Sequence, residues 1–157
     1  MRFLRWIGRN GALFLTIVWI VVTAMAIAAP LLANMSPWFS AGCYLGLKPL
    51  CHQLTERSFH LSGHKMGLCA RCFGIFAGMS VFGVISLILK RRFSLPLTAM
   101  FAFVAPMAVD GVAQIFGLWN TGNILRLTTG VLAAFGIVFW VYPIIFELKL
   151  ENSISAD

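Results

Sequence analysis

The chain has 157 residues, of which 60% are hydrophobic and 11% are charged. A typical soluble domain is about 45–50% apolar and about 25% charged, so this chain has too few charges to cover a surface that faces water. The composition therefore excludes a soluble enzyme and a disordered regulator. The net charge of +7 does not indicate a nucleic-acid partner, because the cations stand at the ends of apolar runs, as in membrane proteins.

Four apolar runs are long enough to cross a bilayer as helices, which takes about 20 residues each. They cover residues 12–33, 68–89, 95–117 and 124–146, and the one sizeable connection is the loop 34–67. The sequence therefore predicts an all-α, polytopic membrane protein with a single domain over 1–157. We expect its four spans to form a four-transmembrane-helix bundle in the lipid bilayer.

Orientation follows from the Lys and Arg residues that flank the four runs. With a cytoplasmic amino terminus, seven of these cations lie inside and three lie outside. The seven are Arg2, Arg5, Arg9, Lys90, Arg91, Arg92 and Lys149, and the three are Lys48, Arg57 and Lys65. We therefore expect both termini in the cytoplasm and the loop 34–67 facing outward.

The first run has a second interpretation. Its arginines, its apolar core and Ala24-Met25-Ala26 also resemble a secretory signal with a small-residue cleavage site. The core of a signal usually spans about 7–15 residues. This run is longer, so we expect the first span to be retained.

The outer loop begins with a stretch rich in aromatic residues. Ser36 suits an N-cap, and Pro37 suits the first position of a helix. Trp38 and Phe39 follow, and aromatic side chains gather at the depth of lipid headgroups. We predict a short interfacial helix here, with an irregular aromatic loop as the alternative.

All four cysteines and all three histidines fall between residues 43 and 72. Residues that serve only as filler would be spread over all four runs, so this clustering indicates a chemical site. Cys69-Ala70-Arg71-Cys72 is a C-x-x-C motif at the start of the second run, and at i and i+3 both sulfurs lie on one helix face. The helix dipole and Arg71 favour thiolate, which binds metal or attacks a disulfide.

Further ligands become available if the loop folds back onto the C-x-x-C motif. Three cysteines and one histidine make a Cys3His set, a common tetrahedral zinc site. The candidate ligands are Cys51, His52, Cys69 and Cys72. Because His52 directly follows Cys51 and needs a turn to converge with it, His60 and His64 are alternative nitrogen ligands. We expect Arg71 to balance thiolate charge and Gln53 or Arg57 to donate hydrogen bonds to the ligands.

The same sulfurs support other interpretations. An outer compartment is oxidising, so the cysteines can pair as disulfides. A C-x-x-C motif at the outer mouth of a bundle suits disulfide exchange with electron transfer to a quinone, as in the membrane oxidoreductases that reoxidise periplasmic thiol oxidants. Cys69 and Cys72 would then exchange, with Cys43 and Cys51 as the second pair. The simplest alternative is one structural disulfide that pins the loop to the second span.

A second polar group lies inside the predicted membrane core. Asp110 and Gln114 stand one turn apart in the third run, and Arg126 and Thr129 begin the fourth. An ionised Asp in lipid needs a partner, so we predict an Asp110–Arg126 pair below the cysteines. This pair acts either as a clamp between helices or as a site for a substrate, a quinone or a proton.

The second run also carries a small-residue pattern, Gly74-x-x-x-Gly78. Glycines at this spacing let another helix approach closely. We expect this face to pack against a neighbouring helix, a membrane-protein partner or a second copy of the chain in a homo-oligomer.

These motifs resemble a family of small prokaryotic integral membrane proteins that is classed as a domain of unknown function. The resemblance covers about residues 50–130 and is carried by Cys51-His52-Gln53, Arg57-Ser58-Phe59, Gly63, Cys69-Ala70-Arg71-Cys72-x-Gly74, Asp110-Gly111-x-x-Gln114, Asn123-x-x-Arg126 and Thr129-Gly130. It implies a prokaryotic cytoplasmic membrane and no established reaction. It also implies that Cys51, His52, Cys69, Cys72, Asp110 and Arg126 belong to one functional unit. Cys43, His60 and His64 lie outside the pattern, which weakens the two-disulfide scheme and favours His52 as the nitrogen ligand.

Taken together, the sequence favours an integral membrane protein with an outward-facing site that binds a transition metal, with zinc the first choice. A thiol–disulfide or quinone-linked oxidoreductase is the alternative, and an assembly or transport accessory subunit without chemistry of its own is a third. The sequence contains no P-loop, paired-carboxylate site or Ser-His-Asp pattern, so it gives no support to an ATPase or a hydrolase. Whether the protein is an enzyme stays open at this point.

Overall fold

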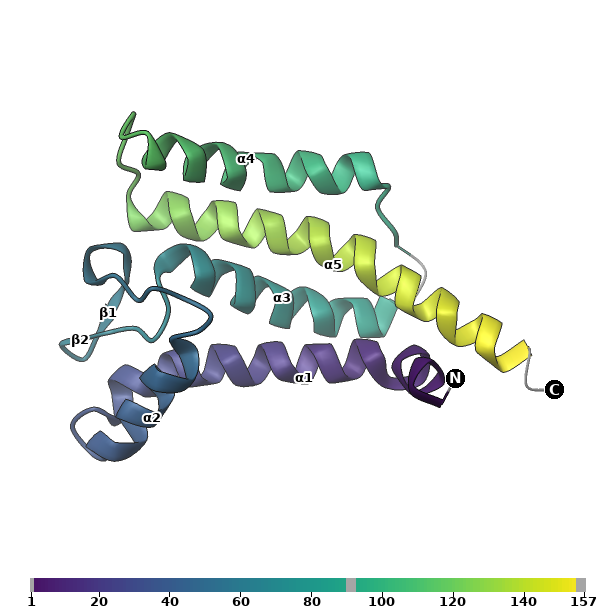
Figure 1. Cartoon of the computed structure of the whole chain (residues 1–157), viewed down its shortest axis with the longest axis horizontal. Coiled ribbons are helices and arrows are strands. Elements are labelled where there is room, and N and C mark those ends of the chain that lie inside the picture. The colour runs from purple at the N-terminus through teal and green to yellow at the C-terminus, as the bar shows by residue number, and fades with distance from the viewer. Residues whose placement is uncertain (1, 90–92, 155–157) are drawn as a thin grey trace.

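A computed structural model describes residues 2–89 and 93–154, with side chains described over 10–89 and 93–147. Helices dominate this part of the chain, and the only strands described form a two-stranded hairpin (Figure 1). The elements in chain order are α1 (Arg2–Leu32), α2 (Pro37–Leu47), the short 3-10 helix η1 (Thr55–Arg57), β1 (His60–Leu61), β2 (His64–Lys65), α3 (Ala70–Leu89), α4 (Leu97–Ile115) and α5 (Asn123–Ile154).

Four of these helices are long and apolar enough to cross a membrane. The apolar segments are Asn10–Leu32, Ala70–Leu89, Leu97–Ile115 and Asn123–Glu147, in α1, α3, α4 and α5. They differ from the predicted spans by at most about two residues at either end. The prediction of an all-α protein with four spans is therefore confirmed.

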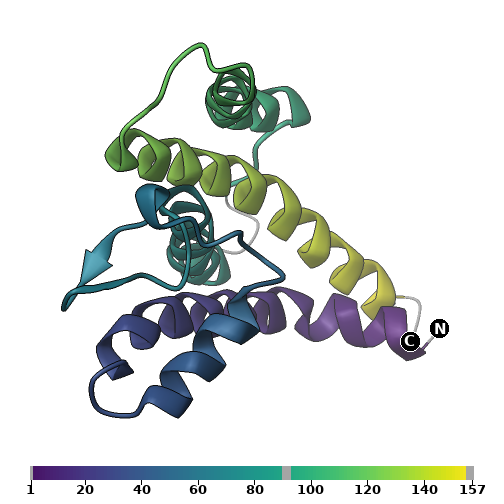
Figure 2. The same ribbon diagram turned by 60° about the vertical axis from the view of Figure 1, so that its left-hand side comes forward.

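The central helix is α5, which packs against α3, α4 and α1. Half of its apolar segment is buried, compared with 17% of that of α4. Figure 1 shows α4, α5, α3 and α1 side by side in that order, and Figure 2 shows α5 crossing the others at an angle. α4 packs mainly on α5, and its outer face exposes large apolar side chains to the surroundings, as expected of a helix that faces lipid.

Glycines let α3 and α5 approach each other closely near the loop. A Cβ atom at Gly74 of α3 would lie 2.4 Å from the carbonyl oxygen of Leu127, and one at Gly130 of α5 would lie 2.5 Å from that of Arg71. Gly78 likewise faces Ala134 of α5. The face that we expected to offer to a partner or a second copy is therefore occupied by a helix of the same chain.

Aromatic rings fill the half of the bundle that lies away from the loop. Phe135 and Phe139 of α5 have ring centroids 4.8 Å apart, and both contact Phe82 of α3 and Phe93. These tilted and edge-on contacts are the arrangements that aromatic pairs prefer. The rings fix how α5 packs on α3.

The loop carries the short helix that the Ser36-Pro37 pattern predicts. α2 begins at Pro37 and packs against α1, where the Ser40 hydroxyl donates a 2.7 Å hydrogen bond to the carbonyl of Ala29. The alternative of an irregular aromatic loop is therefore wrong. Trp38 is 89% exposed, and the location of this helix at a membrane surface stays a prediction.

The rest of the loop is fastened to the helix ends that surround it. The Gly67 N–H donates a 3.0 Å bond to the carbonyl of Ala26 in α1, and the Asn123 side chain of α5 donates a 3.2 Å bond to the carbonyl of Ser58. Ala26 is fully buried. The first span is therefore an integral part of the fold that positions the loop.

The loop elements and the α4–α5 turn gather at one end of the molecule, and α1 begins and α5 ends at the opposite end (Figure 1). Both ends of the described chain therefore lie on one side of the bundle, and which side faces the cytoplasm stays a prediction. The side chains on which the orientation depends, Arg2, Arg5, Arg9, Lys90, Arg91, Arg92 and Lys149, lie outside the described ones.

Candidate functional site

Three of the four cysteines meet where the loop folds over the start of α3. Cys51 comes from the loop, Cys69 directly precedes α3, and Cys72 lies in its first turn. Their Sγ atoms all lie within 4.8 Å of one another. The fourth, Cys43 of α2, is outside this group, and all four are free cysteines. We call Cys51, Cys69 and Cys72 the sulfur trio.

The sulfur of Cys51 accepts hydrogen bonds from two backbone N–H groups. The donors are Cys69 at 3.3 Å and Gln53 at 3.4 Å. Backbone N–H groups aimed at a sulfur stabilise its thiolate. Cys51 is buried, at 6% exposed, in an apolar cluster with Ala26 and Leu47, so these two bonds offset part of the cost of its charge.

The three sulfurs also act on one another. The pKa of Cys51 is lowered to about 2, because the thiols of Cys69 and Cys72 donate hydrogen bonds to its sulfur and the two backbone groups add to this. The pKa of Cys69 is raised by its donation to Cys51 and by burial. The trio therefore concentrates one negative charge on Cys51, with Cys69 protonated.

A strained turn holds Cys51 in place. Gln53 has a φ of 54°, in the left-handed region that residues other than glycine rarely adopt. Its side-chain amide donates a 2.8 Å bond to the carbonyl of Tyr44, and its own carbonyl accepts a 2.9 Å bond from Lys65. The Tyr44 hydroxyl donates in turn to the carbonyl of Lys65. Gln53 thus donates to a candidate ligand through its backbone N–H, whereas its side chain holds the turn.

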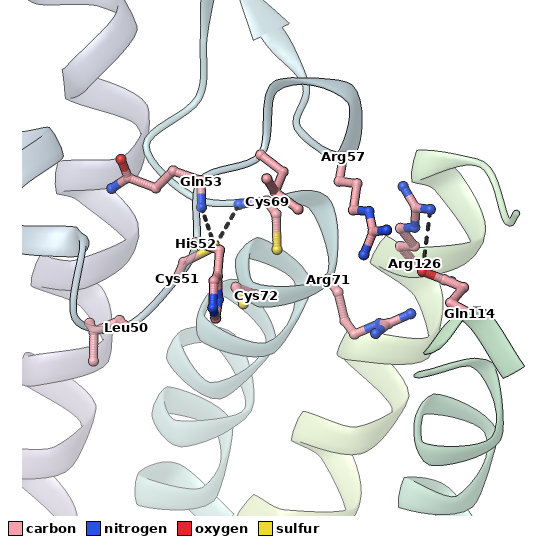
Figure 3. Close-up of a pocket in the computed structure, with 11 residues that line it drawn as sticks. Leu50, Cys51, His52, Gln53, Arg57, Cys69, Arg71, Cys72, Gln114 and Arg126 are labelled. Atoms are coloured by element: carbon pink, nitrogen blue, oxygen red, sulfur yellow. Dashed lines mark hydrogen bonds between the residues drawn. The ribbon is translucent and has the colours of Figure 1, made fainter. Parts of the chain in front are cut away.

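A cavity of about 310 Å³ opens beside the sulfur trio (Figure 3). Its wall includes the three cysteines, together with His52, Gln53, Arg57, Arg71, Gln114 and Arg126. The sulfurs and the polar residues of the membrane-spanning helices therefore share one space.

The histidines differ in how near they come to the sulfurs. His52 lines the cavity with an exposed side chain, but its ring nitrogens are not part of the group within 4.8 Å. His60 and His64 lie on the hairpin and do not line the cavity. The His64 ring is 3.1 Å from the side-chain oxygen of Asn34, which follows α1. Of the three histidines that we considered, His52 is therefore the one that lines the cavity beside the sulfurs.

The membrane-embedded carboxylate has a different partner from the one predicted. Asp110 of α4 forms its salt bridge with Arg71 of α3, and not with Arg126. The glycines at positions 74 and 130 explain the difference, because they bring α3 so close to α5 that Arg71 reaches across to α4. Arg71, which we expected to balance thiolate charge, is thus paired with a carboxylate.

Arg126 instead binds neutral oxygen atoms. Its guanidinium donates to the side-chain oxygens of Asn120 at 2.7 Å and of Gln114 and Asn123 at 3.3 Å each. Gln114 donates in turn to Asp110 at 2.9 Å. Arg126 and Asp110 are therefore linked through Gln114 and do not touch directly.

The polar site in the membrane-spanning helices differs from the prediction at Thr129 and at two residues of the α4–α5 turn. The Thr129 hydroxyl bonds back to the carbonyls of Leu125 and Arg126 in its own helix, and Thr129 does not line the cavity. Asn120 and Thr121, which our sequence analysis missed, bind Arg126 and Gln114 respectively. The polar run from Asn120 to Asn123, between two apolar spans, is the signal that marks them.

Comparisons with known proteins agree with the motifs. A family model described as a predicted membrane protein, DUF2085, matches residues 51–140. The chain belongs to this family. The DUF2085 match begins at Cys51 and includes the whole sulfur trio, Asp110 and Arg126, whereas Cys43 lies before it.

Two relatives extend the comparison. The chain is 41% identical over 120 residues to an uncharacterized protein of Methanocaldococcus jannaschii, which covers 74% of this chain and 76% of that protein. It is 31% identical over 90 residues to an uncharacterized protein of Methanothermobacter thermautotrophicus, covering 56% and 80% of the two chains. No solved structure matches the chain. The DUF2085 membership supports a membrane protein and leaves its chemistry to be argued from the site.

Proposed function

We propose that the sulfur trio binds one transition-metal ion, with zinc favoured. The observation that carries the proposal is that the three Sγ atoms lie within 4.8 Å of one another. In a tetrahedral zinc site with Zn–S bonds of about 2.3 Å, the sulfurs stand about 3.8 Å apart. Small side-chain movements are therefore enough to close the trio around an ion. Thiolate ligands are soft, which favours zinc over magnesium or calcium.

The role of such an ion depends on what occupies its fourth coordination position. Four protein ligands make a closed, structural site, whereas an open position permits chemistry on a bound water or substrate. His52 lines the cavity, and its exposed side chain is free to turn toward the sulfurs. We propose that His52 completes a Cys3His set, and that the adjoining cavity otherwise supplies water to the ion.

The charges around the site suit a thiolate-bound ion. Three thiolates and Zn²⁺ sum to one negative charge, which must be offset near the membrane core. Arg57 and Arg71 line the same cavity. Their guanidinium groups supply the offsetting positive charge, shared in the case of Arg71 with Asp110.

The competing proposal is thiol–disulfide exchange, and the same closeness of the sulfurs favours it. Two thiols of the trio, such as Cys69 and Cys72, would lose two protons and two electrons to form one S–S bond. A quinone would accept both electrons and both protons and become a quinol. A substrate dithiol would reduce this disulfide again through a mixed disulfide, leaving as a disulfide itself and restoring the two thiols.

We further propose that the sulfur trio faces outward from a prokaryotic cell membrane, with both termini in the cytoplasm. The support is the count of seven inner against three outer cations. A membrane-impermeant amine reagent applied to intact cells should label Lys48, which is exposed in the outer loop. Labelling of Lys48 only after the cells are broken would reverse the orientation.

Elemental analysis of the detergent-purified chain, combined with a thiol count before and after reduction, tests the proposed function. We expect about one metal ion per chain, lost in Cys69→Ser and retained in the matched control Cys43→Ser, whose sulfur lies outside the trio. Absence of metal in the wild-type chain, with two thiols that appear only after reduction, would replace the metal site with a disulfide. Retained metal in Cys69→Ser would also contradict the proposal.

A further inference from the structure

Arg126 is a buried cation without a carboxylate partner among the described residues. Only 4% of it is exposed, and its hydrogen bonds all go to neutral amide oxygens. Its Nε atom has no hydrogen-bond partner in the structure. A buried charge that is not compensated is costly, and Arg71 differs from Arg126 because it forms a salt bridge with Asp110.

Arg126 stands between two cavities that share part of their walls. One is the 310 Å³ cavity beside the sulfur trio, and the other has a volume of about 390 Å³. Arg57, Gln114 and Arg126 line both, and Trp119 and Asn120 of the α4–α5 turn line only the second. The second cavity contains no cysteine, so it is a separate place for a ligand.

The guanidinium groups of Arg57 and Arg126 converge at the boundary of the two cavities. Figure 3 shows Arg57 reaching from the loop and Arg126 from α5 toward the same region. Glu56 lines the second cavity but forms no salt bridge within the described side chains. Two neighbouring guanidinium groups therefore lack a carboxylate between them.

We propose that Arg57 and Arg126 bind a phosphate group in the second cavity. The paired N–H donors of guanidinium match the oxygens of phosphate, and a doubly charged or diester phosphate supplies the missing negative charge. The depth also fits, because Arg126 is the fourth residue of α5 and Trp119 marks the interface, where lipid phosphates lie. The phosphate belongs either to a lipid headgroup or to a small phosphorylated solute.

This inference goes beyond the metal proposal and does not depend on it. The second cavity holds none of the sulfur trio. A Cys51→Ser variant should therefore lose metal and keep phosphate binding. An Arg126→Gln variant should do the reverse, so the two proposals can fail separately.

The test uses the full chain in detergent and two probes. Inorganic phosphate is titrated by calorimetry, and phosphatidylglycerol is added in native mass spectrometry with diacylglycerol, which has no phosphate, as its control. Saturable binding of inorganic phosphate indicates a solute. Saturable binding of phosphatidylglycerol alone indicates a headgroup. If neither probe binds saturably, the proposal is wrong.

Three variants tie the binding to the proposed residues. We expect Arg126→Gln to weaken the affinity for the binding probe by about tenfold or more, as for the loss of a hydrogen bond to a charged group. Arg57→Gln should weaken it as well, and this exposed position keeps the test decisive if Arg126→Gln does not fold. Lys48→Gln removes an exposed cation that lines neither cavity and should bind as the wild type does. Wild-type affinity in Arg57→Gln would overturn the proposal.

Discussion

The two halves of the α3–α5 interface are built on different principles. Near the loop, Gly74 and Gly130 bring the two backbones into contact. Polar side chains gather there around the cavity beside the sulfur trio. Toward the opposite end, Phe82 meets Phe135 and Phe139 through ring contacts. Close backbone approach leaves space at its margins for long side chains such as Arg71, whereas packed rings fill the space between the helices.

This difference shows how a small membrane protein separates stability from chemistry. In the aromatic half, the association of the helices depends only on how well the side chains pack, since lipid tails are as apolar as the rings. The loop half carries charges that need specific partners. We therefore expect substitutions in the aromatic half to change stability alone, and substitutions in the loop half to change ligand binding as well.

The largest effect is expected at Gly74. A side chain there would run into the carbonyl of Leu127, which is backbone and has little freedom to move away. Gly74→Val should give no monodisperse folded chain in size-exclusion chromatography. Gly42→Val is the matched control, because no atom lies within 4 Å of a Cβ at Gly42. A folded Gly74→Val chain of wild-type stability would show that the helices need no such close contact.

The second effect is on the stability of the aromatic half. Phe135 contacts four other phenylalanine rings, and its truncation leaves a cavity. Phe135→Ala should lower the free energy of unfolding by about 3 kcal/mol, measured by denaturant titration in micelles. Trp38→Ala, at an exposed position, should change it little. The wild type, Phe135→Ala and Trp38→Ala should all contain the same amount of metal. A loss of metal in Phe135→Ala would show that the aromatic half also affects ligand binding.

The third effect is a dependence of metal binding on pH. Cys51 is already a thiolate because its pKa is lowered, but the raised pKa of Cys69 keeps a proton there at neutral pH. Zinc binds thiolate, so binding must release this proton and the proton of the Cys72 thiol, which also donates to Cys51. The zinc affinity, measured against a chelator between about pH 6 and 8, should rise by about tenfold per pH unit for each proton released. An affinity that does not change with pH would contradict the ligand set.

The smallest effect concerns the ion pair between α3 and α4. Asp110→Asn should destabilise the chain by about 1 kcal/mol, a typical size for polar contacts between membrane helices. In double-mutant cycles, Asp110 should couple more strongly to Arg71 than to Arg126, because it touches only Arg71 directly. A stronger coupling of Asp110 to Arg126 than to Arg71 would instead support the Asp110–Arg126 pair that the sequence predicts.

Much of the fold follows from the sequence because each span is a long apolar run. The helix at Pro37 is also predictable, since its start signal is local. The approach of Cys51 to Cys69 and Cys72 follows less directly, from the clustering of cysteines around one loop. These features depend on residues that are close in the sequence or on the simple requirement that apolar segments meet lipid.

The partners of the charged groups could not be predicted in the same way. The choice of Arg71 over Arg126 for Asp110 depends on how closely α3 and α5 approach, and Gly130 is recognised as a contact only when the helices are placed. Which histidine lines the cavity beside the sulfurs depends in the same way on the path of the loop. Long side chains choose among several partners within reach, so their pairing requires the three-dimensional arrangement.

X-ray absorption spectroscopy at the edge of the bound metal tests the central claim most directly. It counts the ligands of the ion and identifies their elements in the intact chain. We expect three sulfur ligands at about 2.3 Å and one nitrogen or oxygen ligand at about 2.0–2.1 Å. A spectrum with only nitrogen and oxygen ligands would contradict the claim that Cys51, Cys69 and Cys72 form the site.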